Sequence, residues 1–291
     1  MNASTYSRAT LAALLPYPAE DMNKYTRGRL ICAVGSAKYP GAACLGACAG
    51  EYMGAGYTQV ITEATVVPYL HAASPSLVVT DWDDVDPASL PAATEGHPCA
   101  YDVGSGYDAT DAMAKIRTRL ILENAQAPVL LDGGSLDVAS GQKIRDILAD
   151  RALKGFANVF TPHEGEAARM AAPLGIATEN QGELAYNLAK AYSGTVMVKG
   201  PKTYISDGES LVLMDQGTQA LAKAGTGDVL AGMTASLLAQ GLMPLDACVL
   251  ASTLHAFAGR IAAERLSNIC VRAEDVIAAI PKAIYKLDQE K

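Results

Sequence analysis

The amino-acid sequence predicts an α/β fold with a mostly parallel central sheet, helices on both of its faces and a small antiparallel hairpin. Short apolar runs, typical of buried parallel strands, alternate with helical patterns through the first two thirds of the chain. A hairpin pattern follows this alternation, and the last third is helical in pattern. Half of the 291 residues are hydrophobic and 19% are charged, so the composition is that of an ordinary globular protein and excludes intrinsic disorder.

The strands are expected where the apolar runs stop at turn residues. The first run covers 29–34 and ends at Gly35-Ser36, and the others cover 57–62, 77–80, 99–103, 129–132, 158–160 and 195–199. Helical patterns at 108–124, 140–149, 162–171 and 182–192 lie between several of these strands. Strands joined by helical crossovers run parallel, so this alternation predicts a parallel sheet.

The first long helix should begin at Pro40, and it carries a glycine at every fourth position: Gly46, Gly50 and Gly54. Glycine costs roughly 1 kcal/mol relative to alanine inside a helix. Three glycines on one face therefore predict close packing, which we expect against the sheet.

A two-residue turn, Asp207-Gly208, connects the runs 202–205 and 210–214 and predicts an antiparallel hairpin at one edge of the sheet. The last helices are expected at 228–240, 245–266 and 273–287. Residues 229–245 carry no charge, but two glycines and a proline interrupt the stretch, so it predicts a buried helix rather than a membrane span. No linker or repeat divides the chain, which favours a single domain over residues 1–291.

The charge and the cysteines limit the partners and the compartment. The net charge is −8 and no cluster of Lys and Arg offsets it, so neither nucleic acid nor a membrane surface is an expected partner. The six cysteines form no C-x-x-C pair and mostly lie in apolar runs, which is typical of reduced thiols. The apolar cluster at 11–15 is too short for a signal peptide, so we expect a cytoplasmic protein.

The glycine-rich segment 224–232 is the sharpest local signal for chemistry. Gly225, Thr226 and Gly227 form a turn that runs straight into an apolar helix. The amide groups of such a turn and the partial positive charge of the helix start can hold a phosphate. Asp228 follows in the first helical turn, where it either stabilises the helix start or accepts a proton from an attacking hydroxyl, as in phosphoryl transfer. The second role requires a divalent cation to relieve the repulsion between this carboxylate and the phosphates.

A second segment, Thr161 to Glu166, follows one predicted strand and opens a predicted helix. Thr161 as N-cap, Pro162 at the first helical position and Glu164 at the third form a capping box. His163 then has no capping role and should project at the carboxyl end of the sheet, where open α/β folds bind ligands. The other histidines have no motif context and are expected to be packing or surface residues: His71, His97 and His255.

Three further strand ends carry glycine or charge. Lys199 follows an apolar strand and can reach a phosphate, and Gly200 allows a nucleotide to approach the backbone closely. Val103-Gly104-Ser105-Gly106 and Asp132-Gly133-Gly134 end two other strands. This pattern is typical of a pocket rim and specifies no chemistry by itself.

Together these segments resemble one family, the ADP/ATP-dependent NAD(P)H-hydrate dehydratases, a branch of the ribokinase-like superfamily. The resemblance covers residues 25–284, and five motifs carry it in this order. They are Gly35-Ser-Ala-Lys-Tyr-Pro-Gly-Ala-Ala43 with its glycine-rich helix, Val103-Gly-Ser-Gly106, Thr161-Pro-His-Glu-Gly-Glu166, Lys199-Gly-Pro-Lys-Thr203 and Leu221-Ala-Lys-Ala-Gly-Thr-Gly-Asp-Val-Leu-Ala-Gly232. The resemblance implies a ribokinase-like three-layer sandwich.

The resemblance also implies a repair reaction of nicotinamide cofactors. Such enzymes use ADP or ATP, with Mg²⁺, to phosphorylate the hydroxyl of hydrated NADH or NADPH, and elimination of phosphate restores the reduced cofactor. In that scheme Asp228 is the base, and Gly225, Thr226 and Gly227 form the anion hole. The implied nucleotide contacts are Lys199, Gly200, Pro201, Lys202, Thr203 and Gly227. The implied contacts with the hydrated cofactor are Ala43, Gly104, Gly106, His163 and Asp228, and Glu166 is the candidate metal ligand.

The chain departs from the family pattern in two respects that matter here. The family often carries Asp-Ala-Asp where this chain has Asp132-Gly133-Gly134, so no role is expected for a carboxylate at position 134. Many relatives also have an N-terminal epimerase domain, whereas residues 1–24 are only a short extension, so we expect a separate protein to supply the epimerase. Relatives often form tetramers, and we therefore expect a homo-oligomer.

Two other functions stay open at this point. A ribokinase-like kinase of a hydroxymethylpyrimidine or a thiazole would use the same anion hole and aspartate base. The segments 199–203 and 161–166 together favour the dehydratase over that kinase. A catalytically silent nucleotide-binding regulator is the second alternative, and the presence of Asp228 disfavours it. A dinucleotide-dependent dehydrogenase lacks support, because no G-x-G-x-x-G follows the first strand.

Overall fold

The computed structural model describes residues 3–290 and contains a nine-stranded mixed sheet. Its strands are β1 (Arg29–Ala33), β2 (Tyr57–Thr62), β3 (Val78–Asp81), β4 (Cys99–Val103), β5 (Val129–Leu131), β6 (Asn158–Phe160), β7 (Thr195–Val198), β8 (Thr203–Ser206) and β9 (Leu211–Met214). Their order across the sheet is β3-β2-β1-β4-β5-β6-β7-β8-β9. The strands β1 to β7 pair in parallel, whereas β8 and β9 are added antiparallel at one edge, so the predicted sheet and hairpin are confirmed.

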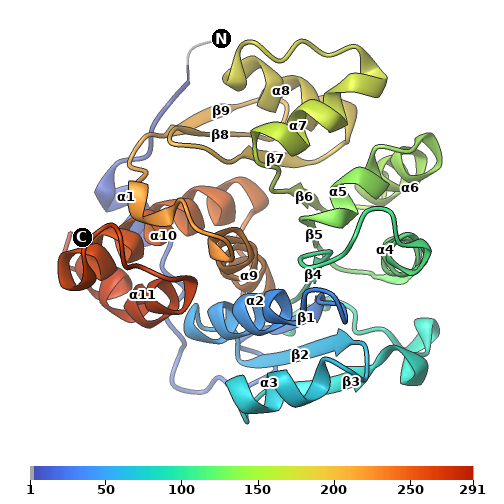
Figure 1. Cartoon of the computed structure of the whole chain (residues 1–291), viewed down its shortest axis with the longest axis horizontal. Helices are drawn as coiled ribbons and strands as arrows, with labels where there is room; N and C mark the ends of the chain where they lie inside the picture. The colour runs from blue at the N-terminus through green and yellow to red at the C-terminus, as the bar shows by residue number, and fades with distance from the viewer. Residues whose placement is uncertain (1–2, 291) are drawn as a thin grey trace.

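Helices cover both faces of the sheet. They are α1 (Arg8–Ala13), α2 (Pro40–Tyr52), α3 (Val67–Ala73), α4 (Ala112–Asn124), α5 (Gly134–Ala139), α6 (Gln142–Leu153), α7 (Glu164–Ala171), α8 (Gln181–Ala191), α9 (Thr226–Ala239), α10 (Pro244–Leu266) and α11 (Ala273–Asp288). In Figure 1, α2, α9, α10 and α11 lie to the left of the strands and α4, α5 and α6 to the right. The molecule is therefore a three-layer sandwich.

Each face of the sheet has its own hydrophobic core. In β1, Leu30 and Cys32 belong to the core under α2, α9 and α10, whereas Ile31 and Ala33 belong to the core under α4 to α8. Successive side chains of a strand point to opposite faces, so a strand buried on both faces must be apolar throughout. This is why continuous apolar runs, rather than alternating ones, mark the strands in this sequence.

The helices α2 and α9 cross at glycine residues. A methyl group at Gly232 of α9 would lie 2.0 Å from the carbonyl oxygen of Gly46 in α2, and a methyl at Gly50 would lie 2.3 Å from the Leu30 side chain in β1. The predicted close packing is therefore against both the sheet and α9. Gly54 lies beyond the end of α2 with a φ of +110°, so only two of the three glycines serve the helix face.

The predicted two-residue hairpin turn is wrong. Ser206 pairs directly with Leu211, which leaves a four-residue loop between β8 and β9. The Asp207 carboxylate accepts hydrogen bonds from the amides of Glu209 at 2.9 Å and Ser210 at 2.7 Å. This side-chain-to-backbone turn replaces the tight backbone turn expected from Asp-Gly.

The three shortest α-helices, α1, α3 and α5, were not expected from the sequence. Each has only six or seven residues, too few for a clear helical period. The start of α5 lies in the predicted pocket rim, and Gly133 and Gly134 do line a cavity there.

The structure also bears on membranes and thiols. None of the helices within residues 3–290 is both long enough and apolar enough to span a bilayer. The six cysteines are free thiols, as predicted. The prediction of a buried helix for the uncharged stretch 229–245 is confirmed for 229–239, which are buried within α9, whereas 240–245 are partly or fully exposed beyond its end.

Candidate active site

The segments that carry the motifs meet at the carboxyl ends of the parallel strands. Backbone hydrogen bonds join neighbouring segments: the Gly35 amide donates to the Ser105 carbonyl at 2.7 Å, and the Lys199 amide donates to the Pro162 carbonyl at 2.8 Å. The carboxyl ends of neighbouring parallel strands lie at the same edge of a sheet. Motifs that are far apart in the sequence therefore lie side by side.

The glycine-rich turn forms the start of α9, which begins at Thr226. Gly225 is the N-cap residue and has a φ of +91°, a conformation that a residue with a side chain adopts only with strain. The Thr226 hydroxyl donates to the carbonyl groups of Leu221 and Lys223, each at 2.8 Å, and so fixes the turn. No side chain caps α9, and the Thr226 amide donates to the Lys223 carbonyl at 3.4 Å, so the Gly227 amide is the one in this turn that is left for a negatively charged ligand.

Two cavities lie on either side of this turn. The first, which we call the lysine cavity, has a volume of about 730 Å³ and contacts Thr226 and Gly227. Its wall also includes His163, Lys199, Gly200, Pro201, Thr203, Met214, Leu221, Lys223, Leu230, Ser252 and His255. The second, the carboxylate cavity, has a volume of about 870 Å³ and contacts Gly225 and Asp228. Its wall also includes Lys38, Tyr39, Ala42, Gly106, Asp108, Asp137, Glu166 and Arg169.

Asp228 lies in the first turn of α9, at the wall of the carboxylate cavity. Burial raises the pKa of Asp228 to about 6, the charge of Asp132 raises it as well, and Lys199 opposes the shift. General bases work best when their pKa lies near the working pH. Asp228 is therefore a base suited to near-neutral pH, beside a turn that can bind phosphate.

Lys199 is held at the same place by a buried ion pair. Its Nζ donates to Asp132 Oδ1 at 2.8 Å, and the Thr161 hydroxyl donates to the same oxygen at 2.7 Å. Burial lowers the pKa of Lys199, but the charges of Asp132 and Glu166 outweigh this effect and leave the pKa raised, so the ammonium group stays charged. A methyl group at Gly227 would lie 3.5 Å from Nζ, which places the ammonium group beside the start of α9.

The predicted capping box is wrong in its residues, because α7 begins at Glu164 and its N-cap is His163. The His163 Nδ1 accepts hydrogen bonds from the amides of Gly165 at 3.0 Å and Glu166 at 3.4 Å, and Glu166 Oε2 accepts from the His163 amide at 2.8 Å. Thr161, the predicted N-cap, bonds the carboxylate that follows β5 instead. His163 therefore caps α7 while it also lines the lysine cavity.

Most residues expected at the site fall into one of the two cavities. Of the expected nucleotide contacts, Lys199, Gly200, Pro201, Thr203 and Gly227 line the lysine cavity. Of the expected substrate contacts, Gly106 and Asp228 line the carboxylate cavity, whereas His163 lies on the lysine side. The expected nucleotide contacts thus gather on one side of the turn at the start of α9, whereas the expected substrate contacts divide between the two cavities.

Three expected residues line neither cavity. Lys202 borders an adjoining hollow of about 590 Å³. Ala43 is fully buried, with its Cβ pressed toward Gly35, and its neighbour Ala42 lines the carboxylate cavity instead. Gly104 has a φ of +106°, and a methyl group there would meet the Ser135 hydroxyl at 2.1 Å, so this glycine allows two loops to pack.

Sequence reasoning missed three buried polar residues near the site. Asp132, noted only as part of a pocket rim, pairs with Lys199. Asp102 in β4 is fully buried, and within the described chain neither of its carboxylate oxygens has a hydrogen-bond partner. His255, expected to be a packing or surface residue, is 6% exposed and lines the lysine cavity. Asp132 gave a signal in the sequence as an acidic residue at a strand end, and Asp102 gave one as the lone charged residue in an apolar strand, whereas His255 gave none.

The residues at the turn fit a magnesium ion that arrives with a nucleotide. Within residues 3–290, no three His, Cys, Asp or Glu side chains are arranged to hold a metal ion. Mg²⁺ is commonly bound by one or two carboxylates together with nucleotide phosphates rather than by a protein cage. Glu166 and Asp228 both line the carboxylate cavity, so carboxylates are available beside the turn for such an ion.

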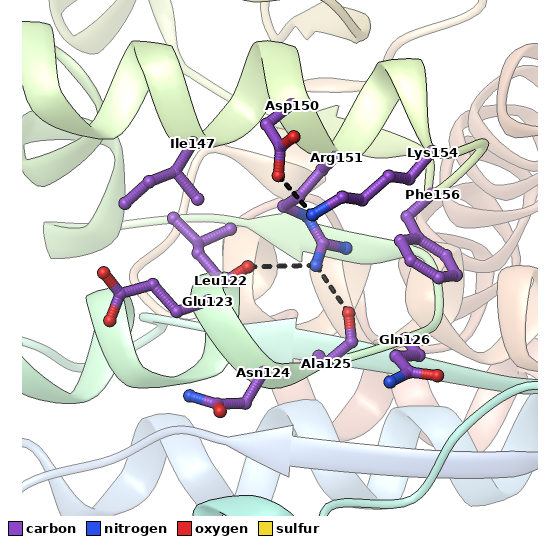
Figure 2. Close-up of a pocket in the computed structure, with 10 residues that line it drawn as sticks. All are labelled: Leu122, Glu123, Asn124, Ala125, Gln126, Ile147, Asp150, Arg151, Lys154 and Phe156. Carbon is purple, nitrogen blue, oxygen red and sulfur yellow. Dashed lines mark hydrogen bonds and ion pairs between the residues drawn. The ribbon is translucent and has the colours of Figure 1, made fainter.

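A cavity of about 560 Å³ lies at the other edge of the sheet, beside the amino ends of β5 and β6. Figure 2 shows Arg151 at its back, with Lys154 paired to Asp150 in front. The Arg151 guanidinium donates from Nη1 to the carbonyl groups of Leu122 at 3.2 Å and Ala125 at 2.6 Å. These bonds cap the carboxyl end of α4. Arg151, at the back of this cavity, therefore has a structural role.

The chain is similar to known proteins in sequence and in fold. A family model described as NAD(P)H-hydrate dehydratase matches residues 30–282. The chain is 30% identical to the ADP-dependent (S)-NAD(P)H-hydrate dehydratase of Xanthomonas campestris, over 97% of this chain and 96% of that protein. It is 34% identical to the bifunctional NAD(P)H-hydrate repair enzyme of Salinibacter ruber, over 94% of this chain and 51% of that protein. The crystal structure of the ADP/ATP-dependent NAD(P)H-hydrate dehydratase from Bacillus subtilis, co-crystallized with ATP/Mg²⁺, matches with a TM-score of 0.83 and 25% identity, over 99% of each chain.

Proposed function

The chain belongs to the NAD(P)H-hydrate dehydratase family, and on that premise we propose that it uses ADP to dehydrate (S)-NADHX and (S)-NADPHX to NADH and NADPH. The family match covers most of the chain and includes every strand except part of β1. It favours cofactor repair over the kinase and the silent regulator that the sequence left open. An intact Asp228 in a buried site also favours an active enzyme.

One observation carries the assignment of roles: two cavities meet at the start of α9, and a buried carboxylate lies on one side only. We place the nucleotide in the lysine cavity, with its terminal phosphate at the first turn of α9. The hydrated nicotinamide ring occupies the carboxylate cavity, so its hydroxyl approaches the phosphate from the side of Asp228. A transfer between two bound partners depends mainly on such positioning and on charge stabilisation.

The reaction then proceeds in two stages. Asp228 takes the proton of the ring hydroxyl while the hydroxyl oxygen bonds to the terminal phosphorus, and the bond from that phosphorus to the bridging oxygen breaks. The electron pair of the broken bond leaves with the nucleotide, as AMP when ADP is used. The phosphate ester next leaves the ring as inorganic phosphate, and loss of a ring proton restores the double bond of the reduced cofactor.

The Gly227 amide at the start of α9 and the ammonium group of Lys199 stabilise the negative charge on the transferring phosphoryl group. Asp132 supports Lys199 through the 2.8 Å ion pair and is not available as a second base while that pair persists. Glu166 would hold a Mg²⁺ ion that arrives with the nucleotide, and that ion would supply positive charge to the phosphates. Asp228 and the phosphates can then occupy the same site without strong repulsion.

The test is an assay of the purified chain with hydrated NADH, Mg²⁺ and either ADP or ATP. Recovery of the absorbance of reduced nicotinamide measures the repair, and the AMP or ADP formed should equal the NADH recovered. We expect a higher kcat/KM with ADP than with ATP. The proposal fails if no reduced cofactor appears, or if hydroxymethylpyrimidine or a hydroxyethylthiazole is phosphorylated faster.

The remaining expectations concern the cellular setting. We propose a cytoplasmic enzyme, supported by its free thiols. The epimerase partner is proposed to act from a separate protein or a separate segment, because the chain spans about half of the bifunctional relative. A homo-oligomer, such as a tetramer, stays a proposal, which the molecular mass in solution tests directly.

A further inference from the structure

The carboxylate cavity is acidic, although the substrate that we place in it is an anion. The charged residues of its wall are four carboxylates, Asp108, Asp137, Glu166 and Asp228, and two cations, Lys38 and Arg169. Hydrated NADH and hydrated NADPH both carry a negatively charged diphosphate between their two nucleosides. Repulsion from the carboxylates opposes the binding of this group unless a cation lies next to it. One of the two cations is therefore expected to meet the diphosphate.

Arg169 is committed to partners within the protein. Its Nε donates to Asp137 Oδ1 at 2.7 Å, and its Nη2 donates to Asp137 Oδ2 at 3.2 Å. Its Nη1 donates to the carbonyl group of Gly165 at 3.3 Å. A carboxylate that is bonded to two nitrogens of one guanidinium forms a strong and directed pair. Every nitrogen of this guanidinium thus has a protein partner, and its charge is balanced by Asp137.

Lys38 is the less committed cation. Its Nζ donates to Asp108 Oδ2 at 2.7 Å and lies 5.1 Å from the centroid of the Tyr39 ring. Asp108 and Tyr39 both line the carboxylate cavity, so the ammonium group itself lies at the cavity wall. An ammonium group has three donors, and within residues 3–290 Asp108 supplies its one hydrogen-bond acceptor. The Lys38 side chain is also 61% exposed, so its remaining donors are accessible to a ligand.

Asp108 does not depend on Lys38 for its hydrogen bonds. Its Oδ1 accepts from the Thr110 amide at 3.0 Å and from the Thr110 hydroxyl at 2.7 Å. These bonds keep the carboxylate in place when the lysine side chain turns away. Ion pairs at the protein surface contribute little to stability. The ammonium group can therefore move from Asp108 to a phosphate oxygen at little cost.

The loop between β1 and α2, which carries this lysine, is held in place. The Ser36 hydroxyl donates to the Gly106 carbonyl at 2.7 Å, and the Ala37 amide donates to Glu63 Oε2 at 2.8 Å. Arg117 Nη1 donates to the other oxygen of Glu63 at 2.7 Å, so this carboxylate is itself oriented. A loop that is already ordered loses little entropy when a ligand binds. Only the lysine side chain has to move.

We propose that Lys38 binds the diphosphate of the hydrated cofactor at the open side of the carboxylate cavity, while the nicotinamide ring lies beside Asp228. The inference rests on the proposed function, because it assumes that this cavity receives the hydrated cofactor. It gives Lys38 a part in substrate binding and none in the transfer of the phosphoryl group. Lys38 therefore affects KM for the hydrated cofactor and leaves kcat unchanged.

Removal of the charge tests this role. In Lys38→Met, KM for hydrated NADH should rise about tenfold, whereas kcat and the Kd for ADP should change by less than about twofold. The hydrated form of reduced nicotinamide riboside carries no phosphate, so its kcat/KM should be equal in the variant and the wild type. Lys38→Arg keeps the charge and should restore most of the affinity for hydrated NADH. Lys115→Met removes an exposed charge of α4 outside the cavity wall and is the matched control.

Three results would overturn the proposal. If kcat/KM for the phosphate-free riboside falls as much as that for hydrated NADH, Lys38 maintains the shape of the cavity and does not bind the diphosphate. If only hydrated NADPH is affected, Lys38 contacts the phosphate on the adenosine ribose, which hydrated NADH lacks. If the Kd for ADP rises and KM for hydrated NADH does not, Lys38 contacts the nucleotide.

Binding of NADH, the product, gives a readout that does not need the reaction. By calorimetry, the Kd for NADH should be about tenfold higher for Lys38→Met than for the wild type and Lys115→Met. If the wild-type chain fails to dehydrate hydrated NADH but this difference in Kd is present, the proposed function falls and the role of Lys38 stands. Equal Kd values for NADH overturn the role of Lys38.

Discussion

Lys199 is the cation around which the acidic residues of the site are arranged. The charges of Asp132, Glu166 and Asp228 all act on its ammonium group, and Asp132 holds it at 2.8 Å. A buried charge that loses its partner is strongly destabilising, typically by 3–5 kcal/mol. The ammonium group therefore supports the fold as well as the phosphate site.

These two roles can be separated with a pair of variants. Lys199→Met should lower both the free energy of unfolding, by about 3 kcal/mol, and the affinity for ADP, because Asp132 is left buried without its partner. Adding Asp132→Asn should restore stability and leave the affinity weak. Urea unfolding and calorimetric titration measure the two effects. Lys202→Met, in the same segment but exposed, is the matched control. Normal ADP affinity in the double variant would remove Lys199 from the nucleotide site.

Asp102 is the opposite case, a buried carboxyl group that lacks a protein partner in the described structure. Burial, with the charges of Asp132 and Asp228, raises the pKa of Asp102 well above its usual value of 3.8. A carboxyl group with a raised pKa in the folded state stabilises the protein only below its unfolded pKa, and this stability is lost as the pH rises toward the folded pKa. Asp102 therefore lowers stability at neutral pH.

Asp102→Asn should remove this dependence on pH. We expect the variant to exceed the wild type in free energy of unfolding by about 1 kcal/mol or more at pH 7 to 8. The difference should shrink as the pH falls below the unfolded pKa of 3.8, because the wild-type carboxyl is then protonated in both states. Thermal unfolding across this range measures it, with the exposed Glu95→Gln as control. A difference that does not change with pH would contradict the assignment.

At the scale of elements, the sequence predicted the strands well and the helix starts less well. The bounds of β2, β4 and β6 agree with the apolar runs, because a strand buried on both faces has to be apolar along its whole length. The start of α7 was misplaced because Thr161 and His163 can both cap a helix. Thr161 is instead engaged by Asp132, which accepts its hydroxyl hydrogen bond from the loop after β5. A local motif cannot show such a contact.

The contact between α2 and α9 is the element-scale feature that places the start of α9. A methyl group at Gly232 would lie 2.0 Å from the Gly46 carbonyl, whereas one at Gly41, also in α2, would have no neighbour within 4 Å. We expect Gly232→Ala to lower the free energy of unfolding by about 3 kcal/mol or more. Gly41→Ala should be neutral or stabilise by up to about 1 kcal/mol. Chemical denaturation measures both, and a tolerated Gly232→Ala would mean that the two helices are further apart than described.

At the scale of the whole molecule, the two edges of the sheet formed by the ends of the parallel strands, the carboxyl edge and the amino edge, have different roles. The carboxyl edge carries the cavities and motifs, and the amino edge carries the buried Arg151, which is 3% exposed. The sequence identified the first edge, because four of the five motifs follow strand ends there and the fifth opens α9. It gave no hint of the second, because Arg151 belongs to an ordinary helical pattern and its partners are backbone carbonyl groups.

This division predicts that stability and activity can be changed separately. Arg151→Met should lower the free energy of unfolding by about 3 kcal/mol, because several buried carbonyl groups lose their donor. Its kcat, corrected for the folded fraction, should equal that of the wild type. Lys154→Met, which removes only the exposed pair visible in Figure 2, should change stability by about 0.5 kcal/mol or less. A fall in kcat for Arg151→Met without loss of folded protein would contradict this prediction, because it would show that Arg151 at the amino edge affects the reaction at the carboxyl edge.

Asp228→Asn tests the central claim, that the carboxylate at the start of α9 takes the proton of the ring hydroxyl. This variant keeps the shape of the side chain and removes its basicity. We expect turnover of hydrated NADH to fall by about 10²- to 10⁴-fold while the Kd for ADP changes little. In the wild type, kcat/KM should decline below about pH 6, where burial leaves the pKa of Asp228. Turnover that survives Asp228→Asn unchanged would show that another group removes the proton.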